Sequence, residues 1–372
     1  MRVLFTCGGT GGHINPAVSV ANLIKEKHPE AAILFAGATG GMETELVPRE
    51  GYELRTVDIS SFERSLTPAN IVHNVKTLFT MNRARRQAQK ILDEFRPDVV
   101  VGTGGYASYP IIERAAARGV PTAIHESNFS PGLTTRMLAP KVDRIMVNYA
   151  ECASEYPDAS KVEVTGTPVR NGFLFMGRQE ARQKLGLGPE PLVVSYWGSL
   201  GAREMNKKIA DFMALEAGTG EFRHIHSTGS FGWKWMPDYV RQKGVDLENC
   251  PFIDMREYIY DMPAVMSAAD VIISRAGAST IGELCAAAIP AVLVPSPNVA
   301  ENHQEKNARA LERRGAAVVM TEKECTGEGL LALVRELLAD PDRLREMSAS
   351  LRSLAVVDAS ERIYGIIRQL TA

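Results

Sequence analysis

A glycine-rich loop that ends in histidine, Gly8-Gly9-Thr10-Gly11-Gly12-His13, is the first feature of this sequence that could do chemistry. It follows the apolar run Val3–Thr6 and precedes apolar residues at helical spacing. Glycines at a strand-to-helix turn let the backbone approach a ligand, and the helix N-terminus supplies free N–H groups for an anion. The loop is not a P-loop, because no Gly-Lys-Ser/Thr follows, and Ile14 breaks the dinucleotide pattern Gly-x-Gly-x-x-Gly. A dehydrogenase is therefore disfavoured.

Two further polar strand ends lie in the same half of the chain. Gly102-Thr103-Gly104-Gly105-Tyr106 and His125-Glu126-Ser127-Asn128 each follow an apolar run. Because the carboxyl ends of parallel strands share one edge of a sheet, the three loops are expected to form one binding surface. The last motif lacks the second histidine of His-Glu-x-x-His, which excludes a zincin.

The second half of the chain carries its own strand–loop–helix motifs. Gly198-Ser199-Leu200-Gly201 could bind a phosphate, and the stretch Ser274–Glu283 is the most informative in the sequence. A strand is expected to end at Ser274 and a helix to start near Ser279, which places Glu283 in the first turns of that helix. A carboxylate there can accept two hydrogen bonds from a ribose diol, while the helix N-terminus faces a diphosphate.

Composition narrows the class of protein. The 372 residues suffice for two or three domains, and 42 Lys and Arg against 44 Asp and Glu give a net charge of −2. This balance argues against a nucleic-acid partner. The five cysteines lie far apart without a Cys-x-x-Cys pair, so reduced thiols in a cytosolic compartment are expected. Pro290, Pro295 and Pro297 interrupt the longest uncharged apolar stretch, so any membrane contact should be peripheral.

Short apolar runs alternate with amphipathic stretches, which predicts an α/β fold with parallel sheets. The expected strands are Val3–Thr6, Ala32–Ala36, Val99–Gly102, Thr122–Ile124, Arg144–Val147, Leu192–Tyr196, Arg223–His226, Val271–Ser274, Ala291–Val294 and Ala316–Met320. Helices are expected at about 71–95, 205–215, 280–287, 304–313 and 330–338. We predict two doubly wound Rossmann-like domains facing each other across a cleft. They span residues 1–165 and 191–372, with a linker at 166–190, and the last helix is a candidate for packing back on the first domain.

Seven motifs together resemble those of the MurG family, peptidoglycan glycosyltransferases of the GT-B fold. They occur in the family's order over nearly the whole chain: GGTGGH, GTGGYASYP, HESN, GTPVR, GSLGAR, SRAGASTIGE and HQEKNA. The form PSPNVAENHQEKNA is similar to that of Gram-positive members. Thr167 stands where the family usually has asparagine and Leu200 where some members have glutamine. Trp197 stands where glycine is common and is expected to narrow the pocket.

The resemblance implies an inverting transfer of N-acetylglucosamine (GlcNAc) from UDP-GlcNAc to undecaprenyl-pyrophosphoryl-MurNAc-pentapeptide (lipid I), giving lipid II for the cell wall. It implies a C-terminal domain that binds UDP-GlcNAc, an N-terminal domain that binds lipid I, and no cofactor. It also implies a peripheral location on the cytoplasmic face of the cell membrane, with cell-wall synthesis and division proteins as candidate partners.

The resemblance assigns roles to individual residues. On the donor side they are Glu283 for the ribose, the main chain of Ile259 for uracil, Ser199 and Arg170 for the diphosphate, Ala278, Ser279 and Thr280 at the helix start that faces it, and Gln304 with His303 for the GlcNAc hydroxyls. On the acceptor side they are Thr10, Gly11 and Gly12, facing the donor sugar and the acceptor pyrophosphate, and Tyr106 and Asn128 near the acceptor.

An inverting transfer needs a base that takes the proton of the acceptor 4-hydroxyl. His13 is the first candidate, because it ends the glycine loop and an imidazole titrates near neutral pH. A helix N-terminus disfavours an imidazolium, so His13 either is the base or only hydrogen-bonds the acceptor or a phosphate. Glu126 is the reserve candidate, although a capping or structural role is favoured for it. Helix N-termini and Arg170 would stabilise the leaving diphosphate.

The chain contains one Asp-x-Asp triplet, the pattern with which GT-A enzymes bind a metal. It is Asp340-Pro341-Asp342, between two helical segments, where Pro and Asp are typical of a helix start. No metal ligand is predicted.

A run of one-signed charge points to a lipid surface. Between Arg64 and Leu92 the charged residues are Arg64, Lys76, Arg83, Arg85, Arg86 and Lys90, without Asp or Glu. The default interpretation is an amphipathic helix that packs its apolar side inward. With a lipid-linked acceptor, binding to anionic phospholipid headgroups is favoured.

Two other classes of function stay open. One is another GT-B enzyme, such as a lipid glucosyltransferase or a UDP-GlcNAc 2-epimerase, and the epimerase would need no lipid surface. The other is a non-catalytic UDP-sugar-binding module, which would bind UDP-GlcNAc without turnover.

Overall fold

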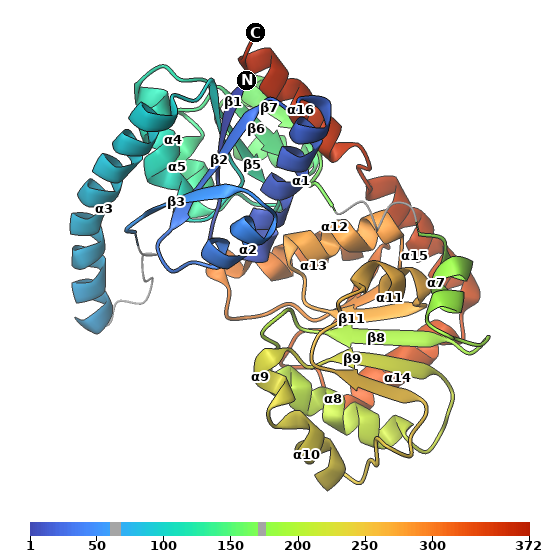
Figure 1. Ribbon diagram of the computed structural model, residues 1–372. Coiled ribbons are helices and arrows are strands. Elements are labelled where there is room, and N and C mark those ends of the chain that lie inside the picture. Colours follow the sequence, from blue (N-terminus) through green and yellow to red (C-terminus); the bar gives the residue numbers. More distant parts are fainter. Residues whose placement is uncertain (60–67, 170–175) are drawn as a thin grey trace. The chain divides into compact units, whose positions relative to one another are not determined.

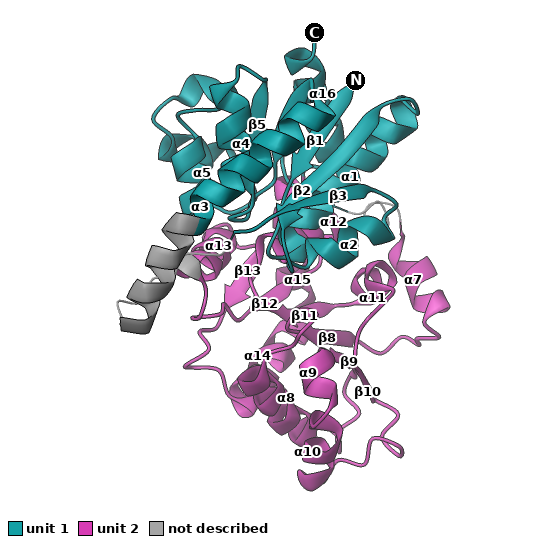
Figure 2. Ribbon diagram, turned by 60° about the vertical axis from the view of Figure 1, so that its left-hand side comes forward, with its two compact units in different colours: residues 1–169, 356–372 teal, residues 170–355 magenta. Residues whose placement is uncertain are grey.

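The computed structural model describes residues 1–59, 68–169 and 176–372. The chain folds as two compact units (Figure 2). Unit 1 comprises Met1–Val169 and Val356–Ala372, and unit 2 comprises Arg170–Ala355. Each is a parallel sheet with helices on both faces (Figure 1), so the predicted class of two doubly wound Rossmann-like domains is confirmed.

Seven parallel strands form the sheet of unit 1, in the order β3-β2-β1-β4-β5-β6-β7. They are β1 (Arg2–Thr6), β2 (Ala32–Ala38), β3 (Glu53–Val57), β4 (Val99–Gly102), β5 (Thr122–Glu126), β6 (Arg144–Val147) and β7 (Val162–Val164). Strand β1 pairs with both β2 and β4, so the strand order reverses beside it. In open parallel sheets ligands bind at such a switch point, outside the carboxyl ends of the strands.

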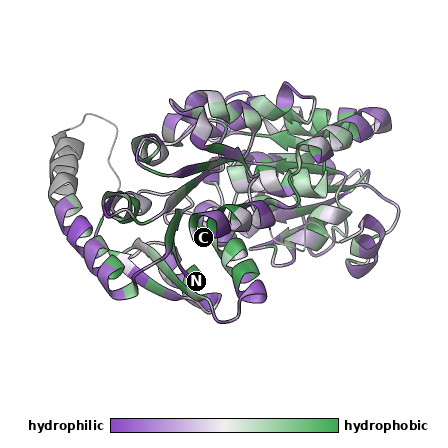
Figure 3. Ribbon diagram, turned by 90° about the horizontal axis from the view of Figure 1, so that it is seen from above, coloured by the Kyte–Doolittle hydropathy of each residue, from purple (hydrophilic) through white to green (hydrophobic). Residues whose placement is uncertain are grey.

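The alternation of side chains along β1 divides the core of unit 1 into two layers. Val3 and Phe5 belong to one layer and Leu4 to the other. Helices α1 (Gly11–Lys27), α2 (Glu43–Arg49) and α16 (Ala359–Leu370) cover the first layer, and α3 (Pro68–Phe95), α4 (Ser108–Ala117) and α5 (Leu133–Leu138) cover the second. Short 3-10 turns, η1 (Ala150–Glu155) and η2 (Ala159–Lys161), lead into β7. The buried strands are mostly green, the hydrophobic end of the scale, in Figure 3.

Helix α16 comes from the end of the chain and docks on α1. Its Ile363, Ile366 and Ile367 are buried in the same core layer as Val3 and Phe5. Two polar contacts fix it at the surface. Lys27 Nζ lies 3.0 Å from a carboxylate oxygen of Glu361, and His28 Nε2 lies 2.8 Å from the Tyr364 hydroxyl.

Six parallel strands form the sheet of unit 2, in the order β10-β9-β8-β11-β12-β13. They are β8 (Leu192–Tyr196), β9 (Arg223–Ser227), β10 (Ile253–Arg256), β11 (Val271–Ser274), β12 (Ala291–Leu293) and β13 (Ala317–Val319). Helices α8 (Arg203–Glu216), α10 (Met236–Gln242) and α14 (Gly327–Leu338) supply side chains to one large core cluster. The other elements among the described residues of the unit are α7 (Arg178–Lys184), α9 (Ser230–Trp233), α11 (Met262–Ala268), α12 (Ala278–Ala287), η3 (Ala300–Asn302), α13 (His303–Glu312) and α15 (Pro341–Leu354).

The ten predicted strands are present, and three others were missed. The missed strands β3, β7 and β10 all lie at the edge of a sheet. Their sequences, ELRTV, VEV and IDMR, mix charged with apolar residues, because an edge strand is partly exposed to water. All five cysteines are buried thiols. In the described part of the chain, no helix has the length and apolar character of a membrane span.

A polar network crosses the otherwise apolar core of unit 2. A carboxylate oxygen of Glu216 lies 2.6 Å from His224 Nδ1, and the Ser195 hydroxyl lies 2.7 Å from both His224 Nε2 and His226 Nδ1. All four side chains are buried. A carboxylate accepts, so His224 donates from Nδ1 and accepts the Ser195 proton at Nε2. The Ser195 oxygen then accepts from Nδ1 of His226, which leaves a lone pair on His226 Nε2.

We expect this network to make unit 2 less stable in acid. Burial lowers the pKa of His226 well below its usual value of about 6.5. When the pKa of a base is lower in the native than in the unfolded state, the unfolded state binds the proton more tightly. The free energy of unfolding is therefore highest above the unfolded-state pKa and decreases as the pH falls below that value. For one titrating group, the free energy of unfolding decreases by at most about 1.4 kcal/mol per pH unit.

Urea unfolding between pH 7.5 and 5, followed by tryptophan fluorescence, tests this, because Trp197, Trp233 and Trp235 all lie in unit 2. His226→Asn keeps a donor at the position of Nδ1 but cannot titrate, so its stability should fall less steeply with acid. Equal slopes for wild type and variant would contradict the assignment.

Candidate active site

The predicted acceptor residues of unit 1 gather at the carboxyl ends of β1, β4 and β5, three adjacent strands. Thr10 is the N-cap of α1, and Gly11, Gly12 and His13 form its first turn. The backbone N–H of His13 donates to the Thr10 carbonyl at 3.1 Å. The glycine loop therefore makes the strand-to-helix turn that its sequence predicts.

The imidazole of His13 has a fixed orientation. Its Nδ1 lies 2.9 Å from the carbonyl oxygen of Gly8. A carbonyl only accepts hydrogen bonds, so Nδ1 carries the proton and the lone pair of the neutral ring lies on Nε2. The carbonyl of His13 in turn accepts from the Thr103 hydroxyl at 2.6 Å, which ties the first loop to the second.

Glycines in the second loop allow this close approach. A Cβ at Gly104 would lie 2.6 Å from Cδ2 of His13, and one at Gly105 would lie 2.3 Å from the Gly8 carbonyl oxygen. Both glycines have positive φ, +112° and +87°, which side chains disfavour. Any other residue at either position would push the second loop away from His13.

Glu43 supports the glycine loop through a buried carboxylate, and it was not predicted from the sequence. Its carboxylate is fully buried and accepts from the backbone N–H groups of Gly9, at 3.1 Å, and Ala38, at 2.6 Å. A Cβ at Gly8 or Gly37 would lie 2.4 Å from its side chain. The available signal was an acidic residue next to Gly40-Gly41, which alone does not distinguish a buried carboxylate from an exposed one.

The third loop is organised by Glu126. Its two carboxylate oxygens accept from the backbone N–H and side-chain amide of Asn128, at 3.1 and 2.8 Å, from the Gly132 N–H at 3.0 Å and from the Thr135 hydroxyl at 2.7 Å. With this set of donors Glu126 has the structural role that we favoured over catalysis. It holds Asn128 at the carboxyl end of β5.

Tyr106 and His125 complete this edge of unit 1. Burial, and then the Glu43 carboxylate, raises the pKa of Tyr106, so its hydroxyl stays a donor at neutral pH. Burial lowers the pKa of His125, whose Nε2 lies 2.8 Å from the Gly166 carbonyl. His125 therefore links β5 to the turn after β7 as a neutral donor, and it is a structural part of the HESN motif.

The predicted donor residues of unit 2 lie at the carboxyl edge of its sheet. Ser199 follows β8, Ile259 follows β10, and Ala278, Ser279, Thr280 and Glu283 lie in α12, which follows β11. Backbone hydrogen bonds join these loops. The Ser230 N–H donates to the Ser199 carbonyl, and the Gly229 N–H to the Glu257 carbonyl, both at 3.0 Å.

Helix α12 begins at Ala278, one residue before the predicted start, with Gly277 as its N-cap. Gly277 has no side chain to cap the helix, so the N–H groups of the first turn remain for an anion. Glu283 is half-buried in the second turn.

Arg275 joins the ends of three strands. Its Nη1 donates to the Val294 carbonyl at 3.1 Å, and its Nη2 lies 2.6 Å from a carboxylate oxygen of Glu322. The guanidinium lies 5.7 Å from the ring centroid of Trp197. Trp197 is buried in the core cluster of unit 2, so the expectation that it narrows a pocket is wrong. A large apolar ring gains more from burial than from an exposed position.

Gln304 and His303 open α13 after a turn in which Glu301 and Asn302 have positive φ. The side-chain oxygen of Gln304 accepts from the Ser296 N–H at 2.9 Å, which fixes the direction of its amide. Ile259 is anchored by its buried side chain, and no backbone hydrogen bond joins it to another described residue.

Arg170, the remaining predicted donor residue, lies outside the described residues. Asp340 is the N-cap of α15 and accepts from the Arg343 N–H at 3.0 Å, so the Asp-x-Asp triplet is the helix start that we predicted. Within residues 1–59, 68–169 and 176–372, no three His, Cys, Asp or Glu side chains are grouped as a metal site requires.

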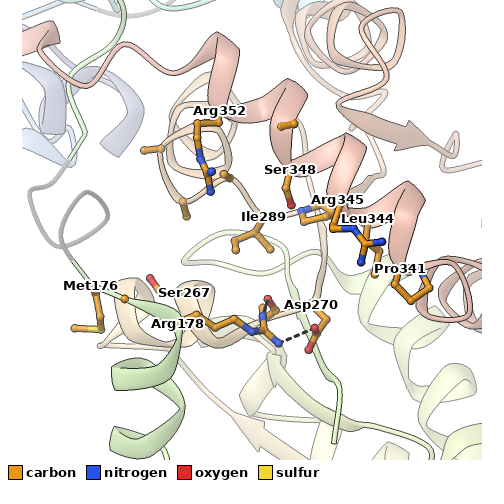
Figure 4. Close-up of a pocket in the computed structure, with 17 residues that line it drawn as sticks. Met176, Arg178, Ser267, Asp270, Ile289, Pro341, Leu344, Arg345, Ser348 and Arg352 are labelled. Atoms are coloured by element: carbon orange, nitrogen blue, oxygen red, sulfur yellow. Dashed lines mark hydrogen bonds and ion pairs between the residues drawn. The ribbon is translucent and has the colours of Figure 1, made fainter. Parts of the chain in front are cut away.

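A cavity of about 830 Å³ in unit 2 lies at the other edge of the sheet (Figure 4). Asp270 and Pro290 line it and directly precede β11 and β12, so it opens at the amino ends of these strands. Arg178 pairs with Asp270 at 2.7 Å beside it. None of the predicted donor residues lines this cavity.

We expect Glu43→Gln to damage the glycine loop. An amide has one oxygen, so one of the two backbone N–H groups would face an NH2 group and lose its acceptor, which costs about 1–3 kcal/mol. Both the thermal midpoint and the turnover should fall. Glu45→Gln is a matched control, because Glu45 lies in the same helix but is exposed and pairs with Arg49. A thermal midpoint that falls equally in both variants would contradict this role for Glu43.

Comparisons with known proteins agree with this geometry. The glycosyltransferase family 28 N-terminal domain matches residues 3–147, and the family 28 C-terminal domain matches residues 193–363. A protein of Caldanaerobacter subterraneus subsp. tengcongensis is 41% identical over 372 residues, covering 100% of both chains. One from Ruminiclostridium cellulolyticum is 40% identical over 371 residues, again covering 100% of both. Each is named UDP-N-acetylglucosamine–N-acetylmuramyl-(pentapeptide) pyrophosphoryl-undecaprenol N-acetylglucosamine transferase.

Solved structures give the same fold. The crystal structure of Acinetobacter baumannii MurG covers 99% of each chain with a TM-score of 0.78 at 25% identity. A UDP-GlcNAc 2-epimerase of Neisseria meningitidis covers 99% of this chain and 100% of its own with a TM-score of 0.66, but at 13% identity it shows the fold alone. The chain therefore has the GT-B fold and belongs to glycosyltransferase family 28 and, within it, to the MurG family.

Proposed function

We propose that this glycosyltransferase moves GlcNAc from UDP-GlcNAc to lipid I and forms lipid II. The observation that carries the proposal is the pair of loop sets at the carboxyl edges of the two sheets, in a chain whose relatives are named for this transfer over their full length. An epimerase is less well supported, because the epimerase shares the fold at only 13% identity. A lipid glucosyltransferase is less well supported, because the full-length relatives are named for transfer of N-acetylglucosamine.

In this proposal unit 2 binds the donor. The N–H groups that open α12, at Ala278, Ser279 and Thr280, donate hydrogen bonds to the diphosphate together with Ser199, and Glu283 accepts hydrogen bonds from the ribose hydroxyls. The main chain of Ile259 pairs with uracil. Gln304 turns its NH2 group away from Ser296 and, with His303, offers it to the GlcNAc hydroxyls.

Unit 1 binds the acceptor, and His13 is the base. Thr10, Gly11 and Gly12 face the pyrophosphate, with Tyr106 and Asn128 beside the acceptor. The acceptor 4-hydroxyl attacks the anomeric carbon, the bond from that carbon to the diphosphate oxygen breaks, and UDP leaves with inversion. The hydroxyl proton goes to Nε2 of His13, the nitrogen whose lone pair the bond from Nδ1 to Gly8 leaves available. Helix N-termini and Arg170 stabilise the leaving UDP.

We expect His13→Ala to lower kcat by about 10²–10⁴-fold, because general bases contribute roughly this much. The KM for UDP-GlcNAc should change little, since the donor is bound by unit 2. The assay follows transfer of radiolabelled GlcNAc to a short-chain, water-soluble analogue of lipid I.

His28→Gln, at the other end of α1, is the control and should keep the wild-type rate. Wild-type protein that binds UDP-GlcNAc tightly without transfer would instead support a sugar-binding module. Full activity in His13→Ala would leave the transfer standing and remove His13 as the base.

The lipid-linked acceptor also calls for contact with a membrane. A hollow of about 540 Å³ in unit 1 is lined by Asn82, Arg85, Arg86, Gln89 and Arg114, from α3 and α4. Arg85 donates two hydrogen bonds to Glu113, at 2.6 and 2.8 Å, whereas Arg86 is exposed and forms no ion pair with a described residue. Arg114 Nε is buried without a hydrogen-bond partner among the described residues. These cations suit the phosphate of an anionic phospholipid.

Other residues of the predicted basic run are paired with carboxylates or lie outside the described residues. Arg83 pairs with Asp58 at 2.8 Å, and Lys90 lies 3.7 Å from Glu94. Arg64 and the side chain of Lys76 lie outside the described residues.

A lipid-linked acceptor also fits an enzyme that works at the cytoplasmic face of the membrane as a peripheral protein, where cell-wall synthesis and division proteins are its candidate partners.

We expect Arg86→Gln to weaken binding to phosphatidylglycerol vesicles about fivefold, from roughly 1 kcal/mol per basic residue near the surface. Sedimentation with vesicles measures this. Arg49→Gln is the matched control, because Arg49 is also an exposed arginine of unit 1 but pairs with Glu45. Equal binding by Arg86→Gln and wild type would remove the hollow from the proposal.

A further inference from the structure

Three apolar side chains protrude at the carboxyl edge of unit 2, Leu200 from the loop after β8 and Phe231 and Trp233 from the short helix α9. Phe231 is 62% exposed, Leu200 is 51% exposed and Trp233 is 40% exposed. The Phe231 N–H donates to the Leu200 carbonyl at 3.3 Å, so α9 lies beside the loop that follows β8. We call Leu200, Phe231 and Trp233 the aromatic ridge. Neighbouring exposed apolar residues of this size mark an interaction surface more often than isolated ones do.

The ridge is held rigidly by the glycines around it. A Cβ at Gly232 would lie 2.3 Å from the amide nitrogen of Asn206, and one at Gly229 would lie 2.1 Å from the Gly201 nitrogen. Gly232 is thus pressed inward against α8, and its neighbours Phe231 and Trp233 are left exposed. The Trp233 N–H donates to the Gly229 carbonyl at 3.0 Å, which closes the turn.

Two cations flank the ridge. Arg203 opens α8 and lies over the ring of Trp235, 5.3 Å from its centroid, and Lys234 is exposed next to Trp233. Neither forms an ion pair with a described residue. Lys207, in the same turn of α8 as Arg203, is neutralised by Glu204 at 2.8 Å. Exposed aromatic rings beside unpaired Lys and Arg are the composition that favours the headgroup region of an anionic bilayer.

We propose that the aromatic ridge, with Arg203 and Lys234, enters the headgroup layer of an anionic bilayer as a lipid contact of unit 2. The inference rests on the proposed function, because a donor-binding unit that serves a lipid-linked acceptor works next to a membrane. The ridge follows β8 and β9, and its Leu200 lies next to Ser199 in the loop after β8. Contact with lipid would therefore bring the donor loops to the surface where the acceptor is anchored.

The tryptophans of this chain report on unit 2 alone. All three lie in it, Trp197 is buried, and Trp235 is half-buried beneath Arg203. Phosphatidylglycerol vesicles with bromine atoms near the headgroup end of their acyl chains quench tryptophans that enter the adjoining headgroup layer. We expect such vesicles to quench the fluorescence of the full chain and Trp233→Phe to remove most of the quenching. Vesicle binding without quenching would overturn the proposal, because it would place the contact elsewhere.

Affinity gives an independent measurement. The double variant Phe231→Ser, Trp233→Ser should bind vesicles at least tenfold more weakly, because it lacks the two rings that the bilayer would partly bury. Lys234→Gln should weaken it about fivefold for anionic vesicles and little for phosphatidylcholine. The matched control is Phe252→Ser, since Phe252 is 38% exposed but directly precedes β10, at the amino edge of the same sheet. Wild-type binding by the double variant would overturn the proposal.

Transfer to the water-soluble acceptor separates this proposal from the proposed function. The double variant should keep the wild-type rate on that acceptor. If wild type itself fails to transfer, the proposed function is wrong, whereas a loss confined to the double variant would place the ridge in a substrate site and overturn the lipid contact. Loss of a dimer in the double variant, with unchanged vesicle binding, would overturn it in favour of a second copy of the chain.

Discussion

The position of His13 in unit 1 depends on close contacts that only glycine residues permit. Gly105 meets the carbonyl of Gly8, and Gly104 meets the imidazole itself, at distances that a Cβ would not permit. The same Gly8 carbonyl accepts from Nδ1 of His13 and so decides which ring nitrogen keeps its lone pair. Glu43 accepts from the Gly9 N–H of the loop and from the Ala38 N–H at the end of β2, and so ties the loop to that strand. The reactivity of one nitrogen thus depends on the packing of glycines from two strand ends.

Unit 2 positions its loops by different means. Backbone hydrogen bonds join the loops after β8, β9 and β10, and Arg275 connects the ends of β11 and β12 to Glu322. Beneath them, α8 is bonded to β9 near both of its ends, through Asn206 to the Thr228 carbonyl at 2.8 Å and through Glu216 to His224. Polar bonds in an apolar core have strict geometry, so they fix the helix along the strand direction more closely than apolar packing does. Helix α8, which follows Ser199, therefore has a fixed position along the direction of the strands.

Much of this arrangement could be predicted from the sequence, and the failures have physical causes. Central strands such as β1 and β8 are buried on both faces and stand out as apolar runs, whereas the edge strand β3 alternates Glu and Arg with apolar residues and does not. The glycine motifs placed both loop sets, because their need for close backbone approach is local in the chain. The contact of Glu43 with the glycine loop could not be predicted, since its partner Gly9 lies 34 residues earlier in the chain, after another strand. Trp197 was misjudged because its position in the chain, next to Gly198, does not reveal which face of the sheet its ring packs on.

The return of the chain from unit 2 to unit 1 has a consequence for synthesis. Ile363, Ile366 and Ile367 of α16 belong to the same core layer as α1 and β1, yet they are made some 340 residues after α1. Until they emerge from the ribosome, α1 lacks the part of its apolar packing that α16 supplies, although all of unit 2 is made before α16. The unit that carries His13 is thus completed last, and during that interval its uncovered face is a natural target for chaperones that bind exposed apolar helices.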